Sequence, residues 1–219
     1  MSKDKKNTDD LIKSLSENLE PTKPIYSVKS CGLLASAFLL FIVVLMGYIG
    51  TNDAVLTRLL NPMFILEMLI LAVSASMAMM AAFRLSVPDT KIRPLTVAFL
   101  LLPTIVLIAL HSFNYLETSS TSLIEEMHNH DLFLHEITNL LLMISLPTAL
   151  LFYVIGRAAP TFRLWTGYAI VLSTACFAAI ALRMFCGMDD GAHLIIYHYL
   201  PVLGVSGLGV FIGAVFLRW

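Results

Sequence analysis

Six apolar stretches with almost no charged side chains alternate with polar segments along the 219-residue chain. Each stretch is close to the ~20 residues that an α-helix needs to cross the hydrocarbon core of a membrane. None alternates between apolar and polar residues as a half-buried strand does. The pattern therefore predicts an all-α, polytopic membrane protein with six transmembrane helices. The predicted helices cover Gly32–Gly50, Met63–Phe83, Leu95–His111, Ile137–Ile155, Leu164–Leu182 and Leu194–Leu217.

Basic residues fall almost entirely on alternate sides of these helices. Twelve of the 14 lysines and arginines lie before the first helix, between helices two and three, between helices four and five, or after the sixth, and the other two are Arg58 and Arg183. Because basic residues concentrate in cytoplasmic segments, both termini are predicted to be cytoplasmic, and the opposite side is called the outer side below. A composition of 58% hydrophobic and 13% charged residues, with a mean hydropathy of +0.83, leaves no room for a separate soluble domain. We therefore expect a cytoplasmic head and tether over residues 1–31 and a transmembrane domain over residues 32–219.

The head contains a pattern typical of one short amphipathic helix. Asn7 or Thr8 is suited to the N-cap, and Asp9 and Asp10 favour the positive end of the helix dipole. Apolar side chains then recur at helical spacing, at Leu11, Ile12, Leu15 and Leu19, before Pro21 ends the helix. A helix of about three turns is marginal alone, and acidic residues disfavour docking on an anionic membrane. We expect it to bind a groove in a partner protein.

All six histidines lie on the outer side or at the outer end of a predicted helix. They are His111, His128, His130, His135, His193 and His198. Three of them form the motif His128-x-His130-Asp131-x3-His135. These three either decorate a solvated loop, supply imidazole ligands to a zinc-like or copper-like ion, or titrate as a pH sensor.

A second polar motif joins the fifth and sixth predicted helices. It reads Cys186-x2-Asp189-Asp190-x2-His193-x4-His198. In an α-helix, five positions place two side chains about 140° apart, so His193 and His198 are expected to share a face only loosely. We expect the outer segments to meet, which would bring His128, His130 or His135 near Cys186 and His193 as a soft-metal sensor.

Cys186 is the only cysteine on the predicted outer side. Cys31 lies at the cytoplasmic end of helix one, and Cys176 lies near the middle of helix five. These separations oppose an intramolecular disulfide. The thiol of Cys186 is either a packed small residue or a group available for oxidation and metal capture.

Other residues within the predicted helices are expected to have structural rather than catalytic roles. Glu67 is the one acidic residue inside a predicted span, and we expect it to face the bundle interior and pair with Arg58, Arg183 or a histidine. Prolines within helices three, four and six are expected to bend or locally open them, at Pro103, Pro147 and Pro201. Small residues allow close helix packing within the bundle or between copies, at Gly209 and Gly213 and at Ser74, Ala78 and Ala82.

Enzymatic function is not expected, because the sequence has no nucleotide-binding loop, His-Glu-x-x-His motif or serine nucleophile elbow. A metal-ion or proton-coupled transporter is an alternative that draws on Glu67 and the histidines, but few polar residues lie at mid-depth. A haem protein would need histidines that face one another across helices, and only His111 and His198 lie within spans. With the resemblance described next, a regulatory binding protein is the leading hypothesis.

Several short motifs, in their order along the chain, resemble the NrsF family of inner-membrane anti-sigma factors, named for negative regulation of a sigma factor F. They are Thr8-Asp9-Asp10-Leu11-Ile12, Arg84-Leu85-Ser86-Val87-Pro88, Ser145-Leu146-Pro147, Arg157-Ala158-Ala159-Pro160, Cys186 with Asp189, His193 and His198, and Leu217-Arg218-Trp219. The resemblance covers nearly the whole chain from Thr8.

The resemblance implies a multi-pass protein of the bacterial inner membrane that holds an extracytoplasmic-function (ECF) sigma factor inactive. The implied partner-binding residues are Thr8, Asp9, Asp10, Leu11, Ile12, Leu15 and Leu19, and the outer side would sense a metal, redox or pH stress. Contact with lipid and self-association are also expected. Relatives carry a further cysteine near the start of the fourth span, where this chain has Ile137–Leu142. A sensor on the outer side of this chain would therefore contain imidazoles and one thiol rather than two thiols.

Overall fold

The computed structural model describes residues 2–17, 28–49, 55–87, 94–118 and 130–218, and every element in these ranges is helical. Long apolar helices coincide with all six predicted stretches, except that Gly50 lies outside the described residues and Leu217 follows the last helix. They are α2 (Val28–Ile49), α4 (Pro62–Leu85), α5 (Pro94–Thr118), α7 (His130–Gly156), α8 (Arg163–Phe185) and a run formed by α9 (Gly191–His193), η1 (Leu194–Tyr199) and α10 (Leu200–Phe216). A short helix, α3 (Val55–Arg58), precedes α4, and α1 (Ser2–Glu17) forms the head.

Five of the described helical runs are long and apolar enough to cross a membrane, namely Pro62–Leu85, Pro94–Phe113, His130–Gly156, Arg163–Phe185 and Gly191–Phe216. Within α2, the apolar segment found over the described residues is shorter, Gly32–Val44. The all-helical class is therefore confirmed. The count of six spans and the orientation stay predictions.

Helix α8 is the centre of the bundle, since 83% of the residues in its most apolar 18-residue segment are buried. Its small residues let neighbouring backbones approach closely. A Cβ atom added to Gly167 would lie 2.2 Å from the carbonyl oxygen of Gly209 and 2.6 Å from the Cα of Gly213. Ser173 donates a hydrogen bond of 3.0 Å to the carbonyl of Ala75 in α4. The glycine row is thus packed inside the bundle, and the other predicted row, Ser74, Ala78 and Ala82, is buried as well.

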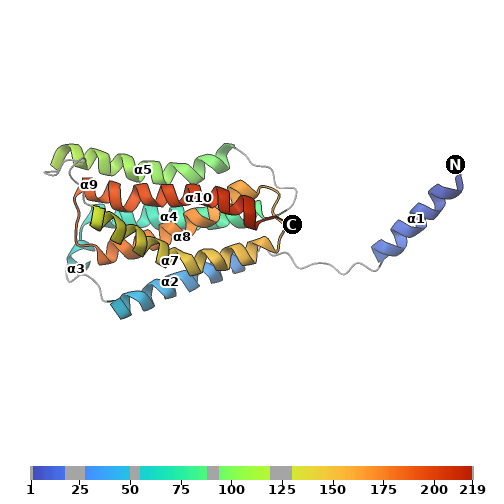
Figure 1. The fold of residues 1–219 in the computed structure, drawn as a ribbon, viewed down its shortest axis with the longest axis horizontal. Coiled ribbons are helices and arrows are strands. Elements are labelled where there is room, and N and C mark those ends of the chain that lie inside the picture. The colour runs from blue at the N-terminus through green and yellow to red at the C-terminus, as the bar shows by residue number, and fades with distance from the viewer. Residues whose placement is uncertain (1, 18–27, 50–54, 88–93, 119–129, 219) are drawn as a thin grey trace.

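The bundle has two distinct ends (Figure 1). Helices α3 and α9 lie at one end, called the α9 end here, and the chain's C-terminus lies at the other, the C-terminal end. The α9 end is the one that the charge pattern predicts to face outward.

Two helices extend beyond their apolar stretches at the α9 end. Helix α5 continues to Thr118 rather than ending at His111, and α7 begins at His130 rather than Ile137. His130 and His135 therefore lie on helical turns and not in a loop. Hydropathy does not detect such turns because they are polar, although Asp131 in the first turn of α7 suits the helix dipole.

The head helix also starts earlier than predicted. Helix α1 begins at Ser2, so the predicted N-cap at Asn7 or Thr8 is wrong. Residues 2–7 contain no glycine or proline that would stop a helix. The basic residues Lys3, Lys5 and Lys6 thus join the helix, which carries four lysines and four acidic side chains and is neutral overall rather than acidic. Leu19 lies outside the described residues.

Helix α1 lies apart from the bundle (Figure 1). Its apolar side chains are exposed, with Leu11 and Ile12 each 58% and Leu15 63% accessible to solvent. Lys13 and Glu17 form an ion pair of 3.9 Å along its polar side. The chain's own bundle does not cover the apolar face.

Candidate functional site at the α9 end

A buried ion pair joins α4 to α8 at the α9 end. Glu67 and Arg183 are each 1% exposed. Arg183 donates from Nε to Oε1 and from Nη2 to Oε2 of Glu67, the latter over 3.0 Å. The hydroxyl of Tyr199 donates to Oε1 of the same carboxylate, and His111 Nε2 lies 3.9 Å from Oε2. Because a buried carboxylate is costly without partners, these contacts explain how Glu67 is tolerated, and its predicted pairing with Arg183 is confirmed.

A second arginine extends this cluster to the segment between α8 and α9. Arg58 of α3 donates to the carboxylate of Asp189 and the carbonyl of Cys186, and Arg183 Nη2 donates to Asp189 over 2.9 Å. Both guanidinium groups lie near the ring of Phe64, at 4.7 and 5.4 Å from its centroid. Partial burial opposes ionisation of Asp189, yet hydrogen bonds from the two arginines hold the pKa of its carboxyl below the ordinary value. The positive charges of two arginines are thus balanced by two carboxylates. We call Arg58, Arg183, Glu67 and Asp189 the charge cluster.

Three potential metal ligands lie beside this charge cluster. Cys186 follows α8, His193 ends α9 and His198 lies in η1. One donor atom from each lies within 4.8 Å of the other two, and Cys186 Sγ is 3.4 Å from His193 Nε2. The two imidazole centroids are 5.4 Å apart. We call Cys186, His193 and His198 the donor triad.

The local helix type explains why the two histidines share a side, which the α-helical expectation of 140° did not anticipate. Residues Leu194–Tyr199 form a π-helix, whose hydrogen bonds join residues five apart. A residue five positions on therefore returns to nearly the same side. Pro201 lies two residues after this π-helix and lacks the N–H that would bond to the carbonyl four residues earlier, which favours such a widened turn. The predicted local opening of helix six is confirmed.

His198 is buried without polar partners. It is 1% exposed, and both its ring nitrogens lack a hydrogen bond to any part of the chain that the structure describes. Buried polar atoms are nearly always bonded, so this imidazole is suited to donate one of its nitrogens to a ligand. Cys186 is half-buried, and burial raises the pKa of its thiol. A metal ion that binds the thiolate must displace that proton.

The histidines of α7 do not belong to the donor triad. His130 and His135 are exposed, and His135 Nδ1 lies 3.3 Å from the side-chain nitrogen of Asn139. His128 lies outside the described residues. The residue of α7 that comes toward the triad is Glu136, whose carboxylate interacts electrostatically with His193 and Cys186. Sequence reasoning missed Glu136, although an acidic residue one position before the apolar stretch was a usable signal.

Tyr199 is a second residue of this site that was not identified from the sequence. Its ring stacks on His111 with centroids 5.0 Å apart, and its hydroxyl lies 3.3 Å from His111 Nε2. A tyrosine within an apolar helix usually needs a partner for its hydroxyl, which was the available signal. His111 Nε2 is thus engaged by Tyr199 and Glu67, which weighs against its use as a haem ligand.

The middle of the bundle offers neutral polar groups only. Thr148 and Thr174 share a hydrogen bond of 2.7 Å, and Cys176 is a buried free thiol. Among the described buried residues, the charged side chains are Arg58, Glu67 and Arg183, all at the α9 end. This scarcity of charged groups at mid-depth, in the part of the chain that the structure describes, weighs against the transporter alternative.

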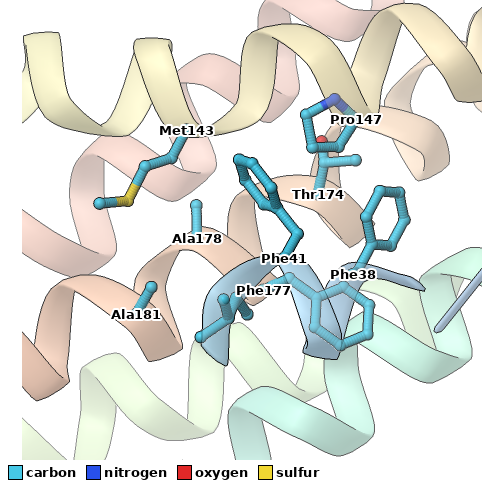
Figure 2. A pocket seen from close by; sticks show the side chains of 9 residues that line it. Phe38, Phe41, Met143, Pro147, Thr174, Phe177, Ala178 and Ala181 are labelled. Atoms are coloured by element: carbon cyan, nitrogen blue, oxygen red, sulfur yellow. The ribbon is translucent and has the colours of Figure 1, made fainter. Parts of the chain in front are cut away.

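Three cavities elsewhere among the described residues are lined mainly by apolar side chains. Figure 2 shows a crevice between α2, α7 and α8, lined by side chains that include Phe38, Met143 and Phe177. Its volume of about 10 Å³ is room for about one water molecule. Two larger grooves of about 730 and 580 Å³ share Val205 and Leu208 and are lined mainly by apolar residues of α7 and α10.

Comparison with known proteins identifies the family. No curated protein and no solved structure gives a match. The family described as NrsF, negative regulator of sigma F, matches residues 15–219. The match includes the whole bundle and every residue of the donor triad and charge cluster, whereas residues 8–12 of the head precede it. Because the match covers nearly the entire chain, the protein belongs to the NrsF family.

Proposed function

We propose that this protein is a membrane-bound anti-sigma factor that sequesters an ECF sigma factor through α1 and releases it when a stress signal reaches the α9 end. The family description supports a sigma factor as the partner. The proposal places the bundle in the bacterial inner membrane, with α1 in the cytoplasm. It assigns no catalytic step to the chain.

The exposed apolar face of α1 is the observation that carries the proposal. Leu11, Ile12 and Leu15 are all more than half exposed on a helix that is barely long enough to be stable alone. Helices of this kind commonly bind by laying their apolar face into a groove of a partner protein.

The direct test is co-purification with the ECF sigma factor encoded nearest to this protein's gene. The double substitution Leu11→Asp and Leu15→Asp should abolish capture, because each lost anchor at an interface centre costs ~2 kcal/mol, or about 30-fold in Kd. The matched control is Ser14→Asp with Ser16→Asp, which adds the same charge to the same helix outside the apolar face. Equal capture by both double variants would refute the assignment of α1.

Orientation is tested separately from partner binding. Reporter fusions at Ser119 and Gly191 should register the outer side, and fusions at Asp89, Ala159 and the C-terminus should register the cytoplasm. An inner-side signal at Ser119 would contradict the six-span topology, because every later helix would then be inverted.

A further inference from the structure

We propose that the donor triad of Cys186, His193 and His198 binds one transition-metal ion of the zinc(II) class. Metal binding at the triad follows from the geometry of the three side chains, whereas the use of this metal as a signal rests on the proposed function. Neither the family description nor any comparison assigns a metal to this protein.

The spacing of the donors fits a metal centre. Tetrahedral zinc with bonds of ~2.0–2.3 Å to nitrogen and sulfur requires ligand atoms about 3.3–3.6 Å apart. The 3.4 Å separation of Cys186 Sγ and His193 Nε2 already meets this requirement. The third donor, on His198, lies within 4.8 Å of both, so a side-chain adjustment of about 1 Å completes the set.

The unsatisfied nitrogens of His198 provide the second, independent observation. This imidazole is 1% exposed, both nitrogens are unbonded among the described residues, and its ring lies edge-on to that of His193. Desolvation without a hydrogen bond is costly, and metal coordination through one nitrogen would offset it. The π-helix is what places His198 there, and π-helical turns are frequent at functional sites.

Charge at the site favours a divalent ion. Arg58 is paired with Asp189, and Arg183 is paired with Glu67 and Asp189, which reduces the positive charge that a cation would meet near the triad. The thiolate that forms at Cys186 when a metal displaces its proton would balance one of the two positive charges of the ion. Thiolate and imidazole are ligands that zinc prefers over magnesium or calcium, which bind oxygen. Since Cys186 is half-buried, the ion can enter from the solvent at this end.

Zinc binding by the full-length protein, purified in detergent and kept reduced, tests the site without any sigma factor. After removal of metal with a chelator, dialysis against zinc(II) should leave one zinc per chain by mass spectrometry. Cys186→Ser and His198→Asn should each weaken binding more than about 100-fold, because even loss of an outer-shell partner weakens metal sites by 10–100-fold. Two control variants should bind zinc as the unmodified protein does. They are His135→Ala, an exposed histidine outside the triad, and Cys31→Ser, a thiol predicted at the other end.

A spectroscopic measurement separates loss of the ligand from loss of the fold. Cobalt(II) in the site should give a thiolate-to-metal charge-transfer band that Cys186→Ser removes, while the metal-free melting temperature of this variant stays unchanged. Absence of bound zinc in the unmodified protein would overturn the proposal. Equal zinc content in the triad variants would overturn it as well, because the metal would then be bound elsewhere. Failure of either kind leaves the capture experiment with α1 unaffected.

Discussion

The two ends of the bundle hold their helices together by different means. At the α9 end, α4, α8 and the segment before α9 are joined by charged groups, chiefly Glu67, Arg183 and Asp189. At the C-terminal end, α8 and α10 are joined by backbone contact between Gly167, Gly209 and Gly213, which we call the glycine seam. Apolar helix packing in a membrane depends on such close contact. A ligand can alter pairing among charges, but it has little to act on in a glycine seam.

This difference suggests a division of labour. The donor triad lies where the chain from α8 turns into α9 and η1, next to the charged groups. The glycine seam then joins the same two helices at the other end. We expect α8 and α10 to respond as one unit, because their contact leaves no space for sliding. The following changes break one end at a time.

The largest expected effect follows Arg183→Met. This change leaves Glu67 buried without its main partner, which costs about 3–5 kcal/mol of stability for a buried ion pair. The control is Arg163→Met on the same helix, where the side chain is exposed and the expected change is within ~0.5 kcal/mol. Thermal unfolding in detergent measures both.

A double substitution sharpens this prediction. Replacing Glu67 and Arg183 together by methionine removes both charges, and such replacements are often nearly neutral. The double variant should therefore be more stable than Arg183→Met alone. If it is less stable, the pair does not act as a unit and the ionic description of the α9 end is wrong.

At the C-terminal end, Gly167→Ala should destabilise the protein by about 1–3 kcal/mol through overpacking. The added methyl would lie 2.2 Å from the backbone oxygen of Gly209, which cannot move aside as a flexible side chain could. Gly204→Ala is the matched control, since nothing lies within 4 Å of its added Cβ. It should be neutral or mildly stabilising. Equal stability of the two variants in a melting experiment would show that the seam is not close-packed.

From the sequence, the positions of the helices and the partner of Glu67 could be predicted, but the helix ends and the triad geometry at the α9 end could not. Apolar stretches were enough to locate six helices, and the cost of burying Glu67 was enough to predict a basic partner. The ends of α5 and α7 were missed because polar helical turns carry no hydropathy signal. The triad geometry was missed because a periodicity of 3.6 residues separates His193 from His198, whereas the π-helix before Pro201 brings them together.

The smallest expected effect is that of Asp189→Asn. The carboxylate is half exposed, with 53% of its side chain accessible, so its pairing with Arg58 and Arg183 should contribute about 0–1 kcal/mol. Its pKa is lower in the folded protein, so this contribution is fully present above the ordinary value of ~3.9 and is lost as pH falls through the folded value. The stability difference between the unmodified protein and Asp189→Asn should thus be constant from pH 7 to about pH 5 and shrink below about pH 4. A difference that vanishes already at pH 6 would contradict this assignment.

The affinity of the full-length protein in lipid nanodiscs for its ECF sigma factor, measured with and without zinc(II), tests the account most directly. A shift of ~3 kcal/mol, or roughly a hundredfold in Kd, would be enough to change sigma-factor occupancy, and by linkage the sigma factor must change zinc affinity by the same factor. The account predicts that zinc weakens sigma binding, that Cys186→Ser abolishes the effect, and that Leu11→Asp with Leu15→Asp abolishes sigma binding itself. A sigma-factor affinity that is the same with and without zinc would contradict control of α1 by the α9 end, and failure to bind any sigma factor would contradict the proposed function as a whole.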